Sequence, residues 1–364
     1  MLNNIVFWGA GNHGRLALQD FDNSKSETER LKGFYDLNKN AKLKNYAILS
    51  DEEINWERDI VVITCDNTSL VANIYEELKE KKVENFYWYT GVKKNEGKEG
   101  FLDFFCVSCS GWGNLILPQV EMHVVDYCNL NCKGCAHFSP LFSRQQPDSI
   151  KRINDIEVLA SKFSHVIKFF LMGGEPFENP EICKYIVEAR KILPNTMIQI
   201  VTNGLLIPTL SKEVLDTIRE NDIVVSISEY EPTHKIIDRI EKVLMDNNIR
   251  YLIRSFNTKQ LFNKPLSISE SSKYNNICIS NGCVNIWEGK IARCPTLMYI
   301  DKFNKTFSMS LPNQGIYNLS ELSGRDILEL MKEDVLLCKH CVKNDITWER
   351  CGKYPTIHDF AEMD

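Results

Sequence analysis

Long apolar runs are missing from this sequence, since none approaches the roughly 18–20 residues that a helix needs to cross a bilayer. The first residues, MLNNIVFWGAGNHG, lack the basic start and the small-residue cleavage site of a secretory signal. The formal net charge of −6 gives no support for binding a phosphate backbone. Internal repeats and low-complexity tracts are missing as well. We therefore expect a cytoplasmic protein with no membrane partner and no nucleic-acid partner.

The composition is that of a soluble globular protein, with 43% hydrophobic and 25% charged residues among 364. A chain of this length is expected to form two or three domains. Thirteen cysteines are many for a cytosolic protein. Disulfide frameworks belong to small secreted chains, so the clustered cysteines indicate ligation of a metal or of an iron–sulfur cluster.

Strand and helix signals divide the chain into four parts within an α/β fold class. Residues 1–95 alternate strands with helices, which predicts a parallel sheet with covering helices. A glycine- and lysine-rich stretch predicts a linker over 96–117. A second series over 118–270 predicts a partial β/α barrel of six units, (β/α)6. Residues 271–364 combine short strands, turns and cysteines into a small module.

Gly9, Gly11 and Gly14 form a G-x-G-x-x-G loop between a strand and a helix, and Asp36 ends the next strand. This context is typical of nucleotide-binding loops, in which helix amides bind a pyrophosphate. The segment resembles the Rossmann-like N-terminal domain of bacterial sugar acyltransferases, which implies binding of a nucleotide-activated sugar. The alternative is a domain that serves packing or dimerisation, and a homodimer is one expected assembly.

A second motif is the loop CNLNCKGC, which follows the first predicted barrel strand. Its Cys128, Cys132 and Cys135 are spaced C-x3-C-x2-C, so three thiolates can hold three corners of a cubane cluster and leave the fourth iron open. An open position is what a catalytic site needs. The alternative is a zinc site with His137 as the fourth ligand, although zinc sites usually use paired C-x2-C units.

The second predicted barrel strand ends in LMGGEP over residues 171–176. The cysteine loop and this GGEP segment, one strand apart and in this order, resemble the radical S-adenosylmethionine (radical SAM) superfamily. The resemblance implies that the open iron of a 4Fe-4S cluster chelates the methionine part of S-adenosylmethionine. Paired glycines allow close approach of a ligand to the backbone. The residues implied to line the amino group of the cofactor are Gly173, Gly174, Glu175 and Pro176.

The same resemblance implies further contacts with the cofactor. Members of the family commonly have an aromatic residue just before the third cysteine, where it supports the adenine. This chain has Gly134 there, and Phe138 is the candidate substitute. Polar residues at later strand ends are either cofactor contacts or ordinary turn formers, and they are Asn203, Ser226, Ser228 and Arg254.

Six cysteines lie in the C-terminal part of the chain. The pattern C-x10-G-x4-C followed by C-x2-C resembles the auxiliary-cluster module of the twitch and SPASM subfamilies. It implies one auxiliary 4Fe-4S cluster, with a structural zinc site as the alternative. Cys283 and Cys351 are unassigned, because each could replace a ligand, protect the cluster or stand free. The implied ligands are Cys278, Cys294, Cys338 and Cys341.

The chemistry implied by the family is reductive cleavage of S-adenosylmethionine to methionine and a 5′-deoxyadenosyl radical, which abstracts hydrogen from a substrate. We expect a small-molecule substrate, with a nucleotide-linked sugar as the candidate, that is oxidised or epimerised. A one-electron reductant such as flavodoxin or ferredoxin is the expected partner. The alternatives are an enzyme that matures ribosomal peptides and, outside enzymes, an iron–sulfur electron-transfer protein or sensor.

Overall fold

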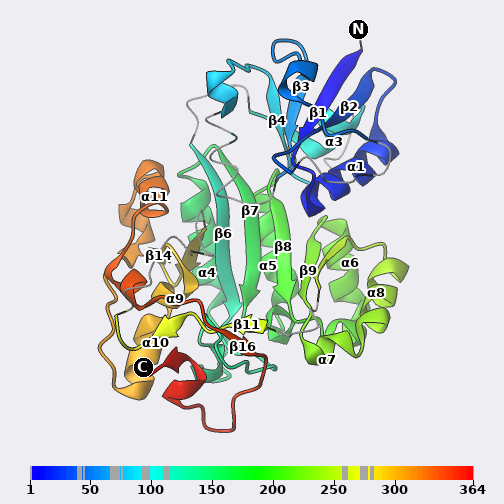
Figure 1. The fold of residues 1–364 in the computed structure, drawn as a ribbon. Coiled ribbons are helices and arrows are strands. Elements are labelled where there is room, and N and C mark those ends of the chain that lie inside the picture. Colours follow the sequence, from blue (N-terminus) through cyan, green and yellow to red (C-terminus); the bar gives the residue numbers. More distant parts are fainter. Residues whose placement is uncertain are drawn as a thin grey trace. The chain divides into compact units, whose positions relative to one another are not determined.

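The computed structural model describes residues 2–38, 43, 46–65, 74, 77–91, 99–109, 115–255, 261–270, 278 and 283–363. The chain divides into two compact units, which are Met1–Pro118 with Asn195–Met197, and Gln119–Pro194 with Ile198–Asp364 (Figure 1). Within the described ranges, no helix has both the length and the apolar character that spanning a bilayer requires.

The first unit is built on a five-stranded sheet in the order β2-β1-β3-β4-β5. The first four strands pair in parallel, and β5 is antiparallel to β4. The mixed α/β architecture with parallel strands that the sequence predicts is therefore present. The elements are β1 Asn3–Trp8, α1 Asn12–Ser24, β2 Glu29–Tyr35, β3 Ile60–Ile63, β4 Phe86–Tyr89, α3 Phe101–Phe105 and β5 Cys106–Ser108, with a 3-10 helix at Asp51–Glu53.

Within residues 96–117, predicted to be a linker, residues 101–108 form α3 and β5 of this first unit. The reason is a buried carboxylate on β2: Glu29 accepts hydrogen bonds from the backbone N–H groups of Phe101 and Leu102, at 2.7 and 2.9 Å. The Phe101 ring also lies 5.3 Å from that of Phe7 on β1. These contacts bind α3 to the sheet over a sequence distance that local patterns do not reveal.

The second unit contains an eight-stranded sheet in the order β10-β9-β8-β7-β6-β13-β14-β15. Strands β8, β9 and β10 pair in parallel, as do β6 and β13, whereas β13 and β14 form an antiparallel hairpin. The strands are β6 Ile116–Val125, β7 His165–Gly173, β8 Met197–Thr202, β9 Val224–Ser228, β10 Tyr251–Arg254, β13 Val284–Trp287, β14 Lys290–Ala292 and β15 Tyr317–Asn318.

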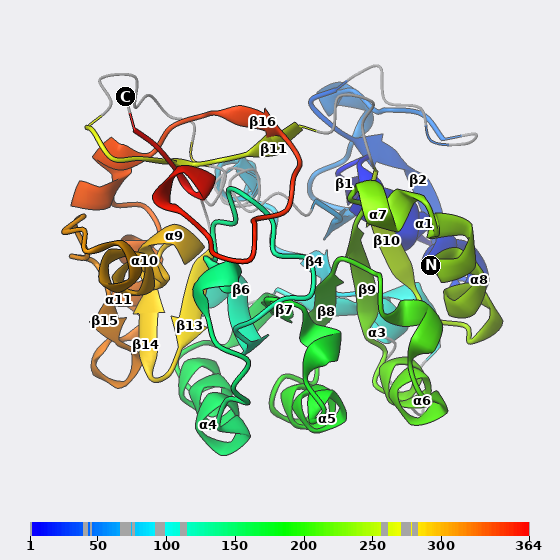
Figure 2. The same ribbon diagram turned by 90° about the horizontal axis from the view of Figure 1, so that it is seen from below.

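This sheet departs from the predicted barrel at its edges. Five of the predicted strands, β6 to β10, are neighbours in chain order, but no described strand pairs with the outer edge of β10. The hairpin β13–β14 extends the sheet beside β6 instead. Figure 2 shows α4, α5 and α6 side by side along one face. The helices are α4 Ser149–Ala160, α5 Ile182–Ile192, α6 Lys212–Glu220, α7 Glu231–His234, α8 Ile237–Asp246, α9 Pro295–Met298, α10 Ile300–Phe307 and α11 Gly324–Leu330.

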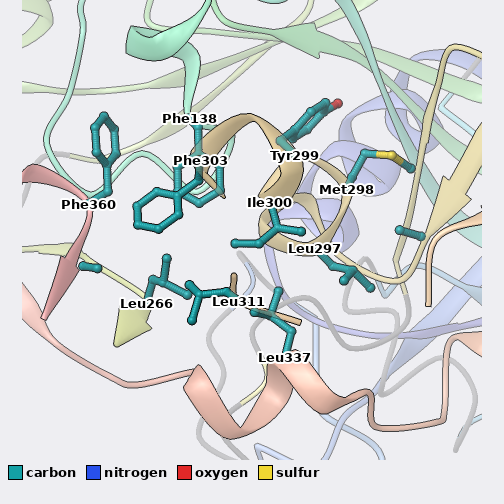
Figure 3. Close-up of a cluster of buried hydrophobic side chains, with 12 residues drawn as sticks. Phe138, Leu266, Leu297, Met298, Tyr299, Ile300, Phe303, Leu311, Leu337 and Phe360 are labelled. Atoms are coloured by element: carbon teal, nitrogen blue, oxygen red, sulfur yellow. The ribbon is translucent and has the colours of Figure 1, made fainter. Parts of the chain in front are cut away.

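Two short strand pairs tie the end of the chain to the segment after β10. Strands β11 (Leu261–Asn263) and β16 (Asp345–Thr347) are antiparallel, and β12 (Leu266–Ser267) and β17 (Ala361–Glu362) are parallel. An apolar core packs among these segments, α9 and α10 (Figure 3). Cys135 and Cys294 both pack against this core. Its buried members are Phe138, Leu266, Ala292, Leu297, Met298, Tyr299, Ile300, Phe303, Leu311, Leu337, Phe360 and Ala361.

Candidate active site

The three cysteines of the CNLNCKGC loop lie together directly after β6. Cys128, Cys132 and Cys135 belong to one small apolar cluster that is centred on the buried side chains of Leu130 and Trp348. All three also line a single cavity of about 320 Å³. The structure therefore groups these thiols around one volume that could hold a ligand.

Burial controls the charge of these thiols. It raises the pKa of Cys128 to about 12, and it raises the pKa of Cys132 and of Cys135 above the usual value. A hydrogen bond of 3.3 Å from the Leu130 N–H to the Cys128 sulfur acts in the opposite direction. The thiols are therefore neutral near pH 7 unless a cation binds them, and binding iron must release their protons.

The loop after β7 is held tightly against the cysteine loop. The N–H of Gly174 donates to Val125 O and that of Glu175 to Tyr127 O, both at 3.0 Å. A Cβ atom at Gly173 would lie 1.9 Å from Val125 O, and one at Gly174 would lie 1.8 Å from Tyr127 O. Gly173 also has a φ of +147°, which side chains of L-residues rarely adopt. Close backbone approach therefore requires glycine at both positions.

Glu175 fastens this loop to the one after β8. Its buried carboxylate accepts hydrogen bonds from the Thr202 hydroxyl at 2.6 Å, the Asn203 N–H at 2.9 Å and the Phe177 N–H at 3.2 Å. Burial raises the pKa of Glu175 to about 7, although the hydrogen bonds work to lower it. The sequence predicted that this carboxylate faces the ammonium of the cofactor, but the side chain is engaged with the protein and does not line the cavity.

The other predicted cofactor residues fall into two groups. Gly173, Gly174, Asn203 and Arg254 line the same cavity as the cysteines. Pro176 does not, because it begins the 3-10 turn Pro176–Glu178. Ser226 is buried within β9, and Ser228 at the end of that strand lines the cavity instead.

Phe138 is a correction to the sequence analysis, since it does not reach the cavity. Its ring lies in the apolar core of Figure 3, at 5.2 Å from the ring of Phe303 and 5.8 Å from that of Phe360. Sequence reasoning missed Tyr230, which does line the cavity and whose ring lies 5.9 Å from that of Trp348. An aromatic residue just after β9 was a signal that could have indicated it.

Residues 122–255 match the family model of the Radical SAM superfamily. This part of the chain is similar to the domains of that family, and it is called the radical SAM domain below. GTP 3′,8-cyclase of Clostridium acetobutylicum is 31% identical over 143 residues, 36% of this chain and 44% of the relative. S-adenosylmethionine-dependent nucleotide dehydratase of Flammeovirga pacifica is 35% identical over 106 residues, 28% of this chain and 35% of the relative. The chain thus spans less than half the length of the curated relatives it matches.

Solved structures give more distant similarities. BtrN in complex with AdoMet and 2-DOIA is 19% identical, covers 61% of this chain and 92% of that chain, and has a TM-score of 0.39. SuiB of Streptococcus suis bound to S-adenosylmethionine is 14% identical, covers 61% of this chain and 64% of that chain, and has a TM-score of 0.35. The family match and the two curated relatives, both enzymes by name, show that the protein is an enzyme, and the family implies S-adenosylmethionine and a 4Fe-4S cluster.

A second group of cysteines lies outside the radical SAM domain. Burial first, and then the nearby sulfurs of Cys278, Cys338 and Cys341, raise the pKa of Cys294 to about 12. These four cysteines are therefore within electrostatic range of one another. The Arg293 guanidinium donates to the Cys278 sulfur at 3.8 Å. Among the described residues, no group of three or more His, Cys, Asp or Glu side chains is arranged to hold a metal ion.

Cys351, which the sequence analysis leaves unassigned, does not lie with this second group. It lies beside the radical SAM domain, where its sulfur acts on those of Cys132 and Cys135 and its N–H donates to Asn131 O at 2.7 Å. Cys283 is buried, and its thiol donates to Val284 O at 3.5 Å. Burial first, and then charges that include the nearby Cys294 sulfur, raise the pKa of Cys283, so only Cys351 is separate from the second group.

A buried polar network begins at Asp126, two residues before Cys128, the first residue of the cysteine loop. Its carboxylate accepts from Arg152 of α4 at 2.7 Å and from the indole N–H of Trp287 on β13 at 3.1 Å. His123 is 3.1 Å from the same carboxylate, and its other ring nitrogen is 2.8 Å from Nδ1 of His137. His137, the alternative zinc ligand, is thus engaged with His123, and the network links β6, α4 and β13.

We expect the Arg152→Met variant to lower the free energy of unfolding by about 3–5 kcal/mol, the cost of leaving one partner of a buried ion pair uncompensated. The Arg152 side chain is 1% exposed. Burial alone would raise the pKa of Asp126, but His123 and Arg152 outweigh it and hold this pKa well below the usual 3.8. The pair therefore stabilises the fold above about pH 4, and its contribution is lost as the pH falls further.

Urea unfolding at pH 7 and at pH 3 measures this effect. The control is Lys151→Met on the same helix, because the Lys151 side chain is 78% exposed and its change should be within ±0.5 kcal/mol. Equal stability of Arg152→Met and the native protein at pH 7 would contradict the prediction.

The glycine loop of the first unit uses its three glycines differently. A Cβ at Gly14 would lie 2.2 Å from Gly9 O, and one at Gly9 would lie 2.9 Å from the backbone N of Cys65, whereas one at Gly11 has nothing within 4 Å. Asp36, predicted to belong to the nucleotide-binding site, accepts from the Ala10 N–H at 2.6 Å and thereby holds the loop. Of these three glycines, only Gly11 has no neighbour among the described residues that would clash with a side chain at its position.

Proposed function

We propose that Cys128, Cys132 and Cys135 hold a 4Fe-4S cluster with one open iron, and that S-adenosylmethionine occupies the adjoining cavity. The observation that carries this proposal is that the three thiols pack in one cluster and line the same cavity as Gly173 and Gly174. The donor set suits such a group, because cysteine thiolates are the usual ligands of a 4Fe-4S cluster and three of them leave one iron open.

The residues around the cavity have separate tasks in this proposal. The backbone at Gly173 and Gly174 receives the amino end of the cofactor. Asn203 is fixed by a hydrogen bond of 2.7 Å from its side-chain amide to Asn129, and with Ser228 and Arg254 it supplies polar contacts to ribose and carboxylate. When bound, the cluster supplies the electron for reductive cleavage of S-adenosylmethionine to a 5′-deoxyadenosyl radical.

Tyr230 supplies the aromatic face for the adenine in this proposal. Gly134 has no side chain to do so, and Phe138 lies in the core. The Tyr230 ring is packed with Leu205 beside the buried Leu130 and Trp348, so its position is set before a ligand binds. The aromatic contact with the adenine would therefore come from the residues just after β9 and not from the cysteine loop.

We further propose one auxiliary 4Fe-4S cluster of the twitch or SPASM kind on Cys278, Cys294, Cys338 and Cys341. The support is their electrostatic proximity, together with N–H groups that point at the sulfurs. The Leu297 N–H donates to Cys294 at 3.4 Å, and the Val335 N–H donates to Cys338 at 3.5 Å. In an oxidation, a cluster held by these four cysteines would supply an acceptor for the second substrate electron.

The proposed substrate is a small metabolite, with a nucleotide-linked sugar as the candidate, that undergoes oxidation or epimerisation. The two curated relatives have names that specify a nucleotide reaction, and the first unit carries the glycine loop. A flavodoxin or ferredoxin would supply electrons. Maturation of a ribosomal peptide is the competing activity.

Anaerobically reconstituted protein with dithionite and S-adenosylmethionine tests the proposal, with 5′-deoxyadenosine measured by liquid chromatography. Oxidation consumes the cofactor stoichiometrically and removes two substrate hydrogens, whereas epimerisation in deuterated solvent places one deuterium on carbon. Protein that binds iron but forms no 5′-deoxyadenosine would favour an electron-transfer protein instead.

We also propose that the first unit is Rossmann-like and binds a nucleoside diphosphate at Gly11. In the native protein we expect saturable binding of ADP, GDP, CDP or UDP by calorimetry. The Gly11→Ala variant should keep its melting temperature and bind the same nucleotide at least about tenfold more weakly, which is 1.4 kcal/mol. Gly14→Ala, the matched variant, should destabilise the unit by about 1–3 kcal/mol because its Cβ meets backbone. A native protein that binds none of the four nucleotides indicates a packing or dimerisation domain.

A further inference from the structure

A segment near the end of the chain, Trp348–Cys351, covers the cysteine loop. The Lys133 N–H donates to Glu349 O at 2.9 Å, and the Cys351 N–H donates to Asn131 O at 2.7 Å. Cys132 and Arg350 form an antiparallel bridge between these two bonds. The segment lies outside residues 122–255, the extent of the radical SAM domain, yet its backbone is registered to the loop residue by residue.

Side chains reinforce this registration. The Lys133 ammonium lies 2.6 Å from the Glu349 carboxylate and 3.8 Å from that of Asp359. The Gly134 N–H donates to Asp359 O at 2.6 Å. Because backbone bonds hold both sides of the contact, a side chain on this segment meets the cysteine loop at a fixed place.

Trp348 makes the decisive contact. Its indole N–H donates to the sulfur of Cys132 at 3.1 Å. The side chain is 9% exposed and packs with Leu130 and Tyr230. An indole N–H is only a donor, and burying it without an acceptor is costly, so the sulfur is the partner that makes tryptophan suitable here.

We propose that Trp348 is a positioning residue that sets the reduction potential of the cluster through this N–H···S bond. The inference rests on the proposed function, because it requires a cluster on Cys132. A donor to a thiolate ligand withdraws charge from the sulfur and stabilises the reduced cluster, which holds one more electron. The bond therefore makes the potential less negative and makes it easier for a one-electron reductant to supply that electron.

The test is a redox titration of the reconstituted full chain followed by electron paramagnetic resonance. The signal that changes when S-adenosylmethionine is added belongs to the cluster with the open iron. Trp348→Phe removes the N–H and keeps an aromatic ring, so we expect a more negative midpoint potential at unchanged iron content. The matched control is Leu205→Met, which packs against the same apolar cluster, is a volume-conserving change that leaves the Trp348 N–H in place, and should leave the midpoint where it is.

An unchanged midpoint in Trp348→Phe, with its cluster present, overturns the inference and leaves the proposed function intact. Native protein that holds no cluster overturns both. If Trp348→Phe loses iron through misfolding, benzothienylalanine at position 348 replaces the N–H by sulfur in a ring of nearly the same shape. The same negative shift is then expected, and its absence again overturns the inference.

Discussion

Replacing Cys132 by alanine is expected to abolish 5′-deoxyadenosine formation and to lower the iron content by roughly four atoms per chain. Cys132 lies in the middle of the loop and is the cysteine that receives the Trp348 N–H. Loss of a ligand should cost more than the 10–100-fold typical of a residue that only supports a ligand, so we expect a rate reduction beyond about a hundredfold. Iron assay, absorbance and product chromatography measure the three effects.

Cys183→Ala is the matched control for this variant. Cys183 lies on α5 and is half-buried, away from both groups of cysteines. Its replacement should keep the iron content and the rate of 5′-deoxyadenosine formation. A Cys132→Ala protein with native iron content and rate would show that the loop does not hold the cluster.

Gly174→Ala is expected to destabilise the second unit and to remove binding of S-adenosylmethionine together. The added methyl would lie 1.8 Å from Tyr127 O and 2.8 Å from Cys128 N, both backbone atoms, so the loop after β7 and the cysteine loop must separate. Overpacking of this kind costs about 1–3 kcal/mol, which lowers the melting temperature by roughly 2–10 °C. Thermal unfolding and equilibrium binding of S-adenosylmethionine measure the two effects.

Gly352→Ala controls for the loss of glycine itself, because a Cβ there has nothing within 4 Å. That variant should melt and bind as the native protein does. If Gly174→Ala bound S-adenosylmethionine normally, the close approach of the two loops would have no bearing on the cavity.

The features that the sequence predicted well are those written in short stretches of chain. Cys128, Cys132 and Cys135 fall within eight residues, so their spacing alone brings the thiols together. The two adjacent glycines, Gly173 and Gly174, have no side chain, and this alone indicates that another part of the molecule approaches the backbone closely there. Strands β6 to β10 carried apolar runs with helices between them, and these gave the parallel pairings of the second unit.

What the sequence could not give depends on partners far along the chain. Phe138 has the residue type suited to an adenine contact, but Phe303 and Phe360 draw it into the core. Cys351 lies in the same stretch of sequence as the other C-terminal cysteines. Its backbone hydrogen bond to Asn131 nevertheless places it beside the cysteine loop at Cys128–Cys135. The Glu175 carboxylate, expected to face the cofactor, instead accepts hydrogen bonds from the Thr202 hydroxyl and the Asn203 N–H. Each outcome was decided by packing, which no local pattern records.

The registration of Trp348–Cys351 on the cysteine loop has a consequence for the order of biosynthesis. Lys133 and Glu349 are 216 positions apart, so a ribosome must add that many residues after Lys133 before this contact can form. Until Trp348–Cys351 has been synthesised, a nascent chain presents the three thiols of the cysteine loop without this segment over them. Delivery of iron and sulfide to the loop therefore has a natural window between synthesis of the loop and docking of Trp348–Cys351.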